Sequence, residues 1–213
     1  MMCRSLFFML ATFLIPACST DTEQSIVALS SNYFSPGELV PPPRFVGLFN
    51  RPRPVLEIEL VDLGVSGKLI LEQQDGPYAR YLSADLGSII LQRGLIHSIY
   101  SFGESLVGAD LSQPLALVLA TQAGVADRIH TYLDGEDRAI SRSYRCDIAV
   151  QGVRDVDLET GTVQTTLMSE TCQNLDQSFE NLYWVDRRRG EVIQSRQWVG
   201  ESVGSLITRV TSP

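Results

Sequence analysis

The sequence of 213 residues has few of the residues that several common functions need. Only one of its 17 basic residues is a lysine, Lys68, and 25 acidic residues give a formal net charge of -8. This acidity excludes non-specific nucleic-acid binding as the main function, because phosphate contacts require a basic surface. The only two histidines, His97 and His130, lack a third ligand in any recognisable motif. No metal or other cofactor is therefore predicted.

The apolar run near the N-terminus is too short to span a membrane. Residues 6–15 are ten uncharged residues after Arg4, whereas a bilayer core of about 30 Å needs roughly twenty. We therefore interpret residues 1–17 as a signal peptide. Residues 14–18 resemble the lipobox of a bacterial lipoprotein, in which Cys18 is acylated with chains such as palmitate and becomes the new N-terminus. The alternative is an ordinary secretory signal followed by a coincidental cysteine.

The residue after the lipobox and the number of cysteines indicate the compartment. Ser19 resembles the sorting signal for the outer membrane, so we expect an outer-membrane lipoprotein of the bacterial cell envelope that faces the periplasm and is attached to the membrane through Cys18. In this oxidising compartment, Cys146 and Cys172 are expected to form a disulfide. Their midpoint falls in a plausible turn at residues 158–161, and a hairpin centred there would place the two cysteines opposite each other.

The mature chain divides into a tether and a folded domain. Residues 18–54 are predicted to be a lipidated tether with a short helix, followed by a proline-rich spacer that contains six of the ten prolines and favours extended polyproline geometry. Residues 55–213 contain short apolar runs separated by turn signals, and one stretch, residues 113–120, compatible with a helix. The prediction is an all-β periplasmic domain, an antiparallel sandwich or open barrel of about ten short strands.

No set of residues predicts a catalytic site. Residues 200–204 match the G-x-S-x-G nucleophile motif, but no histidine follows them, and a turn between the last two strands is the simpler interpretation. Two acidic clusters could in principle serve a glycosidase, although acids in turns are usually only solvated. The clusters consist of Asp134, Glu136 and Asp137, and of Asp155, Asp157 and Glu159.

A hairpin near the C-terminus is the best candidate for a glycan or partner surface. Aromatic faces and arginine side chains suit sugar rings and acidic glycans. The default alternative is that both tryptophans belong to the core and the arginine turn is simply solvated. The residues concerned are Tyr183, Trp184, Arg187, Arg188, Arg189, Arg196 and Trp198.

Two segments of the sequence resemble a known family. Residues 181–197 (NLYWVDRRRGEVIQSRQ) are similar to the "WvD-x-x-tG-x-v-x-x-S-x-Q" segment of the group 4 capsule polysaccharide lipoprotein family, of the YjbF type. Residues 87–106 are similar to that family's "G-x-I-v-x-x-x-G-l-i" segment, and the pattern continues at residues 109–115. The sequence departs from the pattern at residues 98–101 and in its three consecutive arginines, and the cysteine pair is a further difference.

The resemblance implies an all-β periplasmic lipoprotein of exopolysaccharide or capsule export, with no established enzymatic activity. The leading hypothesis is a non-enzymatic outer-membrane lipoprotein that assists capsule assembly and export by binding polysaccharide-export proteins or the acidic polysaccharide itself. Two alternatives remain open, a periplasmic glycan-modifying hydrolase and a carrier of lipids or lipoproteins. The carrier would need an apolar cavity for acyl chains.

Overall fold

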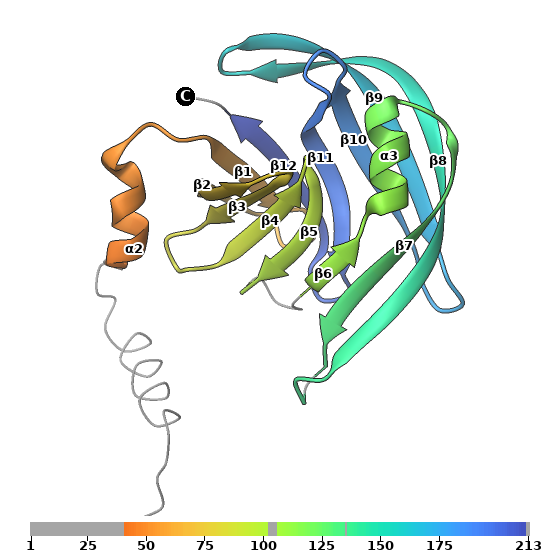
Figure 1. Ribbon diagram of the computed structural model, residues 1–213, viewed down its shortest axis with the longest axis horizontal. Coiled ribbons are helices and arrows are strands. Elements are labelled where there is room, and N and C mark those ends of the chain that lie inside the picture. The colour runs from red at the N-terminus through yellow and green to blue at the C-terminus, as the bar shows by residue number, and fades with distance from the viewer. Residues whose placement is uncertain (1–40, 102–105, 135, 212–213) are drawn as a thin grey trace, which may run out of the picture. The chain divides into compact units, whose positions relative to one another are not determined.

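The folded part of the chain consists almost entirely of β-strands (Figure 1). The computed structural model describes residues 41–101, 106–134 and 136–211. The predicted signal peptide, Cys18 and the tether up to residue 40 lie outside these described residues. Buried and more exposed residues alternate along β1 (Val55–Leu60) and β7 (Gly124–Leu133), the pattern of a sheet with one packed face. The all-β prediction is confirmed.

Most of the other strands begin and end at the turns that the sequence predicted. One strand, β6 (Leu106–Asp110), was not predicted. The remaining strands are β2 (Val65–Asp75), β3 (Tyr78–Leu82), β4 (Ser88–Gln92), β5 (Leu95–Tyr100), β8 (Ala139–Leu158), β9 (Gly161–Gln173), β10 (Ser178–Asp186), β11 (Glu191–Gly200) and β12 (Gly204–Thr211).

Twelve strands form a single antiparallel sheet in the order β5-β4-β3-β2-β1-β12-β11-β10-β9-β8-β7-β6. The first and last strands are neighbours, because Val55 of β1 pairs with Thr211 of β12. The two edge strands, β5 and β6, also meet: the Nδ1 atom of His97 donates a hydrogen bond to the Ala109 carbonyl oxygen at 2.9 Å. The sheet is therefore nearly closed and barrel-like, which agrees with the open-barrel form of the prediction.

The proline-rich segment is partly helical, which corrects the prediction of an extended spacer. Residues Pro43–Val46 form α2, and Gly47–Asn50 form a 3-10 helix, η1. Pro43 suits the first turn of a helix, where its missing N–H costs no hydrogen bond. The apolar side chains of this segment, Phe45 and Leu48, pack against Ile70 and Leu82 of the sheet. Burial of these two side chains therefore outweighs the polyproline preference of the prolines around them.

The concave side of the sheet is filled with side chains. One cluster includes Leu56, Ile89 and Leu206, and a second includes Met168 and Val185, so apolar residues from both halves of the sheet meet in the interior. The carrier hypothesis required an apolar cavity there, whereas these side chains occupy that space. The helix predicted at residues 113–120 is confirmed as α3 (Ser112–Ala120), whose apolar side packs on the second cluster. Within the part of the chain that the structure describes, no helix has the length and apolarity to cross a membrane.

Candidate functional site

The β10–β11 hairpin presents three consecutive arginines to solvent. The Asp186 side chain fixes the turn by accepting hydrogen bonds from the backbone N–H groups of Arg188, at 2.8 Å, and Arg189, at 3.4 Å. Gly190, with φ of +64°, ends the turn in a left-handed conformation that suits glycine. Arg187, Arg188 and Arg189 are all exposed. This arrangement confirms the predicted turn and holds three positive charges on one tip of the sheet.

Some of the residues predicted to form a contact surface at this hairpin are exposed, and others are buried. Tyr183 is 0 % exposed and faces the interior, so it cannot be part of a contact surface. The Trp198 ring stacks on Phe179, with ring centroids 4.5 Å apart, and belongs to the packed interior. Trp184 is half-buried, and Arg196 is exposed along β11. The alternative interpretation is thus correct for Trp198, and the exposed remainder of the predicted surface is mainly the arginine turn.

Tyr183 belongs to a buried polar network instead. Its hydroxyl donates a hydrogen bond to the Glu170 carboxylate at 2.6 Å, and the Arg128 guanidinium lies 3.1 Å from the same carboxylate. Asn181 donates a further hydrogen bond to Glu170 at 2.8 Å. Arg128 also donates to the Tyr183 hydroxyl at 2.9 Å. Arg128 and Glu170 are about as buried as the apolar core, so the ion pair depends on these added hydrogen bonds to offset desolvation.

His130 extends this network as a neutral ring. Its Nε2 atom lies 3.2 Å from Nη1 of Arg128, which can only donate, so Nε2 accepts and Nδ1 carries the proton. Nδ1 then donates to the Tyr132 hydroxyl at 2.9 Å. Burial lowers the pKa of His130 to about 2, and the Arg128 charge acts in the same direction. His130 is therefore a structural core residue and has no accessible face for metal or substrate.

The predicted disulfide is confirmed. Cys146 of β8 lies directly opposite Cys172 of β9, and their sulfur atoms are bonded. The hairpin turns at Leu158 and Gly161, as the cysteine midpoint indicated. Glu170 lies close enough to form a metal-ligand set with the two sulfurs among the described residues. Because the sulfurs are bonded to each other, neither is a thiolate that could bind a metal.

The acidic clusters do not face a common cleft. The cluster at residues 134–137 follows β7, and the cluster at residues 155–159 lies at the far end of the 20-residue strand β8. Opposite ends of a strand of this length are far beyond the separation of a glycosidase carboxylate pair, about 5–10 Å. Residues 201–203 form the turn between β11 and β12, as the simpler interpretation of the G-x-S-x-G match predicted.

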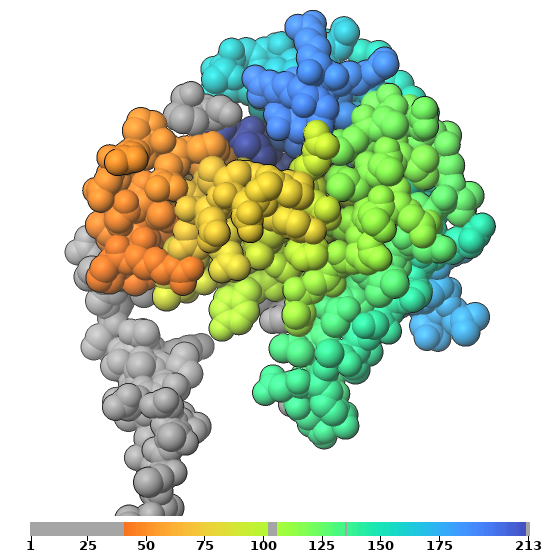
Figure 2. All heavy atoms as spheres, viewed as in Figure 1, coloured from red at the N-terminus to blue at the C-terminus, as the bar shows by residue number. Residues whose placement is uncertain are grey.

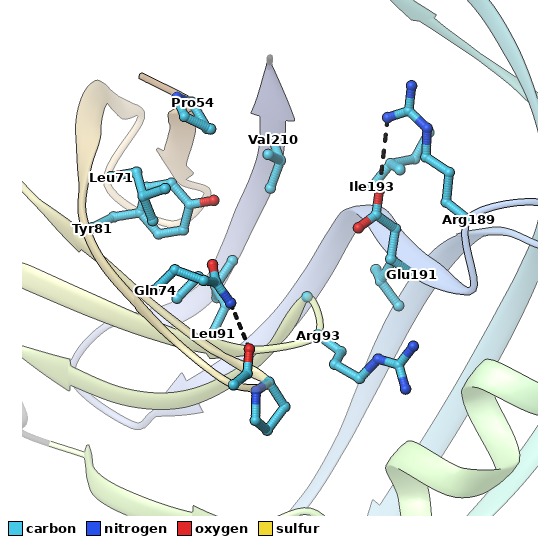
Figure 3. Close-up of a pocket in the computed structure, with 15 residues that line it drawn as sticks. Pro54, Leu71, Gln74, Tyr81, Leu91, Arg93, Arg189, Glu191, Ile193 and Val210 are labelled. Atoms are coloured by element: carbon cyan, nitrogen blue, oxygen red, sulfur yellow. Dashed lines mark hydrogen bonds and ion pairs between the residues drawn. The ribbon is translucent and has the colours of Figure 1, made fainter. Parts of the chain in front are cut away.

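A cleft beside the arginine turn is a second candidate, which the sequence did not indicate. It has a volume of about 570 Å³ and lies between the β2–β4 strands and the β10–β11 turn (Figure 3). Leu71, Tyr81 and Leu91 form one wall, and Glu191 and Ile193 belong to the other. Figure 2 shows the arginine-turn hairpin, in blue, standing above the yellow β2–β3 region with a recess between them. The volume is within the range of small-molecule sites.

Two turns that are far apart in sequence hold the cleft open on one side. Gly94, in the β4–β5 turn, has φ of +95°, and a Cβ atom there would lie 2.5 Å from the Val192 carbonyl oxygen. Next to it, Arg93 donates a hydrogen bond from Nη2 to the Gly190 carbonyl oxygen at 3.1 Å. The sequence predicted both turns but not their contact, so it could not identify Arg93 and Glu191 as neighbours on one side of a cleft.

Comparison with known proteins agrees with the fold and the motifs. The crystal structure of the hypothetical lipoprotein YmcC from Escherichia coli (K12) superposes with a TM-score of 0.66 at 18% sequence identity, and the match covers 87% of this chain and 94% of that chain. At this identity the likeness shows the fold alone. None of the curated proteins compared matches the chain. The family model of the group 4 capsule polysaccharide lipoprotein gfcB, YjbF, matches residues 51–210. Because that match spans most of the sequence, the chain belongs to the YjbF family of group 4 capsule polysaccharide lipoproteins.

Proposed function

We propose that this protein is a non-enzymatic lipoprotein of the outer membrane, anchored through Cys18 and facing the periplasm, which assists capsule or exopolysaccharide assembly and export by holding the acidic polysaccharide. The observation that carries the proposal is the arginine turn. Three adjacent positive charges project from a chain whose formal net charge is -8. The family description supplies the link to capsule polysaccharide.

The turn suits a polyanion because its backbone is fixed while its side chains extend into solvent. Asp186 is 4 % exposed and orders the turn from below. Its carboxylate also lies 3.6 Å from the Arg189 guanidinium. Arg187 and Arg188 have no ion pair with any residue that the structure describes, so their guanidinium groups are available for carboxylates of a passing chain. The planar guanidinium binds a carboxylate through two parallel hydrogen bonds.

Binding, and not hydrolysis, is the activity that this geometry favours. The acidic clusters that a glycosidase would need are separated by the length of β8, and the G-x-S-x-G match forms a turn. A polysaccharide is also a better match than an export protein for this site. Repeated carboxylates can engage successive arginines without a shaped partner surface. An export protein bound at the same turn remains the alternative that the test below separates.

Polysaccharide binding should depend on the arginine turn and on ionic strength. Affinity electrophoresis of the mature chain with Cys18→Ala, in gels containing polygalacturonate or neutral dextran, measures both. The double variant Arg187→Gln/Arg188→Gln should bind polygalacturonate about tenfold more weakly, from roughly 0.7 kcal/mol for each exposed charged contact. Arg145→Gln, an exposed arginine on β8, is the matched control and should bind like the wild type.

Two results would contradict the proposal. Equal retardation by dextran and polygalacturonate would exclude charge recognition. Unchanged binding by the double variant would exclude the turn. A pull-down of the Cys18-anchored protein from cell envelopes then tests the alternative, since recovery of export proteins without carbohydrate would identify a protein scaffold.

A further inference from the structure

The segment that precedes β1, residues 41–54, is basic although the chain is acidic. It contains three arginines and no acidic residue, whereas residues 55–213 contain 13 basic and 22 acidic residues. One of the three, Arg44, donates a hydrogen bond to the Glu72 carboxylate at 2.8 Å. Arg51 is exposed and forms no ion pair with any residue that the structure describes. A negatively charged surface would therefore attract this segment and repel most of the remaining sheet.

The same segment exposes apolar side chains beside its arginines. Phe45 and Leu48 fix α2 and η1 on the sheet, because both side chains are buried in a core cluster there. Val46 and Phe49 instead remain 50 % and 65 % exposed. The Phe49 ring packs edge-to-face on Phe45, with ring centroids 5.3 Å apart, so its exposed face is held in place. Exposed apolar side chains next to arginines are typical of segments that lie in a membrane interface.

The place of this segment in the chain brings it close to a membrane. The family is one of lipoproteins, and the candidate acylated residue, Cys18, precedes Pro41 by 23 residues. A connection of that length spans at most about 80 Å in any conformation. Figure 2 shows residues 41–54, in orange, along one side of the folded part. A tether this short gives the membrane surface an effective concentration of about millimolar, so a weak contact is sufficient.

We infer that α2 and η1 rest on the anionic phospholipid surface that holds the lipid anchor. Val46 and Phe49 enter the boundary between headgroups and acyl chains, and Arg51 contacts lipid phosphates. The inference rests on the proposed anchoring at Cys18. It goes further, because the contact holds the folded part in one orientation on the membrane, which a lipid anchor alone does not impose.

Quenching of tryptophan fluorescence by brominated lipids tests this contact in the tethered protein. The mature chain, residues 18–213, is coupled through the Cys18 thiol to a maleimide lipid in vesicles of phosphatidylethanolamine and phosphatidylglycerol. The other two cysteines are bonded to each other and do not react. Phe49→Trp supplies the reporter, and the emission of the chain without it is subtracted. Lipids brominated on their acyl chains should remove about half of the reporter emission or more.

A second reporter position serves as the control. Leu175→Trp places a tryptophan at a fully exposed position in the β9–β10 turn, which lies across the folded part from α2 in Figure 1. Its emission should be the same with brominated and ordinary lipids. Absence of quenching at position 49 would overturn the inference. Equal quenching at both positions would also overturn it, because the protein would then have no preferred orientation on the membrane.

Variants of the tethered reporter chain separate the apolar and the charged contributions. Arg51→Gln should lower the docking equilibrium constant about fivefold on these vesicles and leave it unchanged on phosphatidylcholine. Val46→Ser should lower it about threefold on both. Asn50→Lys should raise it several-fold on the anionic vesicles, a gain that misfolding cannot produce. Arg145→Gln and Val153→Ser, two exposed positions of β8, are the matched controls. If Arg51→Gln and Asn50→Lys both dock like the reporter chain, the inference is wrong.

Two further measurements separate this inference from other outcomes. Sedimentation of the untethered Cys18→Ala chain should show a monomer, whereas a dimer that dissociates with Phe49→Ser would assign this face to a second copy and overturn the inference. Mass spectrometry of the protein from cell envelopes tests the anchor itself. An unmodified Cys18 would refute the proposed anchor even where the quenching succeeds, and absent quenching would refute the inference even where Cys18 is acylated.

Discussion

Removing the Glu170 carboxylate should destabilise the protein far more than removing it together with its partner Arg128. The two side chains are 0 % and 1 % exposed, and the guanidinium lies 3.1 Å from the carboxylate. Two further donors, Asn181 at 2.8 Å and the Tyr183 hydroxyl at 2.6 Å, complete the carboxylate's hydrogen bonds. Burial raises the pKa of Tyr183 well above its usual value, so its hydroxyl remains a donor at neutral pH.

The magnitudes follow from which charges stay buried. Glu170→Gln leaves the Arg128 cation in the interior without its counter-ion and should lower the free energy of unfolding by about 3–5 kcal/mol. Arg128→Met leaves the carboxylate buried and should cost a similar amount. The double variant buries no charge. Its cost should be only about 2 kcal/mol, from the hydrogen bonds that His130 and Tyr183 lose.

Urea denaturation of the wild type, the two single variants and the double variant measures these costs as a double-mutant cycle. The sum of the single costs should exceed the cost of the double variant by at least about 3 kcal/mol. The m-value should stay constant across the set, which shows that the denatured state is unchanged. Additive costs would refute the reasoning, because they would mean that the two charges do not interact in the folded protein.

Three further changes test other parts of the fold. His130 has a folded pKa of about 2 and an ordinary value of 6.5, so the unfolded chain binds one more proton between these values and stability falls as the pH drops below 6.5. The free energy of unfolding should fall by about 2 kcal/mol at pH 5. His130→Gln should remove this part of the pH dependence of the urea midpoint. If the midpoint of the variant depends on pH as steeply as that of the wild type, the prediction is wrong. Gly94→Ala should cost about 3 kcal/mol or more in the same assay, because its Cβ would meet a carbonyl oxygen at 2.5 Å, whereas Gly47→Ala has open space and should stay within about 0.5 kcal/mol. Replacing Cys146 and Cys172 by alanine should lower stability by about 3 kcal/mol, and equal urea midpoints for the variant and the oxidised wild type would rule this out.

Local sequence signals predicted much of the fold. Turn residues and alternating apolar residues are short-range features, so they indicated the hairpins around Gly94, Gly161 and Gly190. The disulfide followed from one of these turns, because antiparallel pairing from a known turn fixes which residues lie opposite each other. Strand β6 was missed because its five residues include a glycine and an alanine and carry little apolar alternation.

The faces of the β10–β11 hairpin could not be predicted in the same way. The register shifts between Trp184 and Val185, and again between Trp198 and Gly200. A bulge changes which face the following residues occupy, so a surface drawn from sequence spacing alone mixed inward and outward side chains. Tyr183 precedes the irregularity in β10, and simple alternation places it on the face opposite Trp184. Alternation alone does not say which of the two faces is buried, so Tyr183 and Trp198 were grouped with the exposed residues. The burial of Arg128 could not be predicted either, because no feature of the neighbouring sequence distinguishes it from an exposed arginine on a strand.

The two segments that resemble the family meet in the structure, and this contact explains what the motif encodes. Gly94 is a motif glycine of the first segment, and Gln197 is the motif glutamine of the second. The Gln197 side chain accepts a hydrogen bond from the Ile96 backbone N–H at 3.0 Å and donates one to the Gly94 carbonyl oxygen at 3.2 Å. These motif residues therefore hold the β4–β5 turn against β11 and so shape one side of the cleft.

The arginines near the contact between the β4–β5 turn and β11 occupy variable positions of the motif. Arg93 comes directly before Gly94, and the three arginines of residues 187–189 occupy motif positions that the pattern leaves open or fills differently. The motif thus specifies how the two turns dock, whereas the residues between its fixed positions determine which charges the cleft and the turn present. If this division holds, exchanging residues 187–189 between family members should change polysaccharide preference without changing thermal stability, while Gln197→Ala should lower stability in any of them.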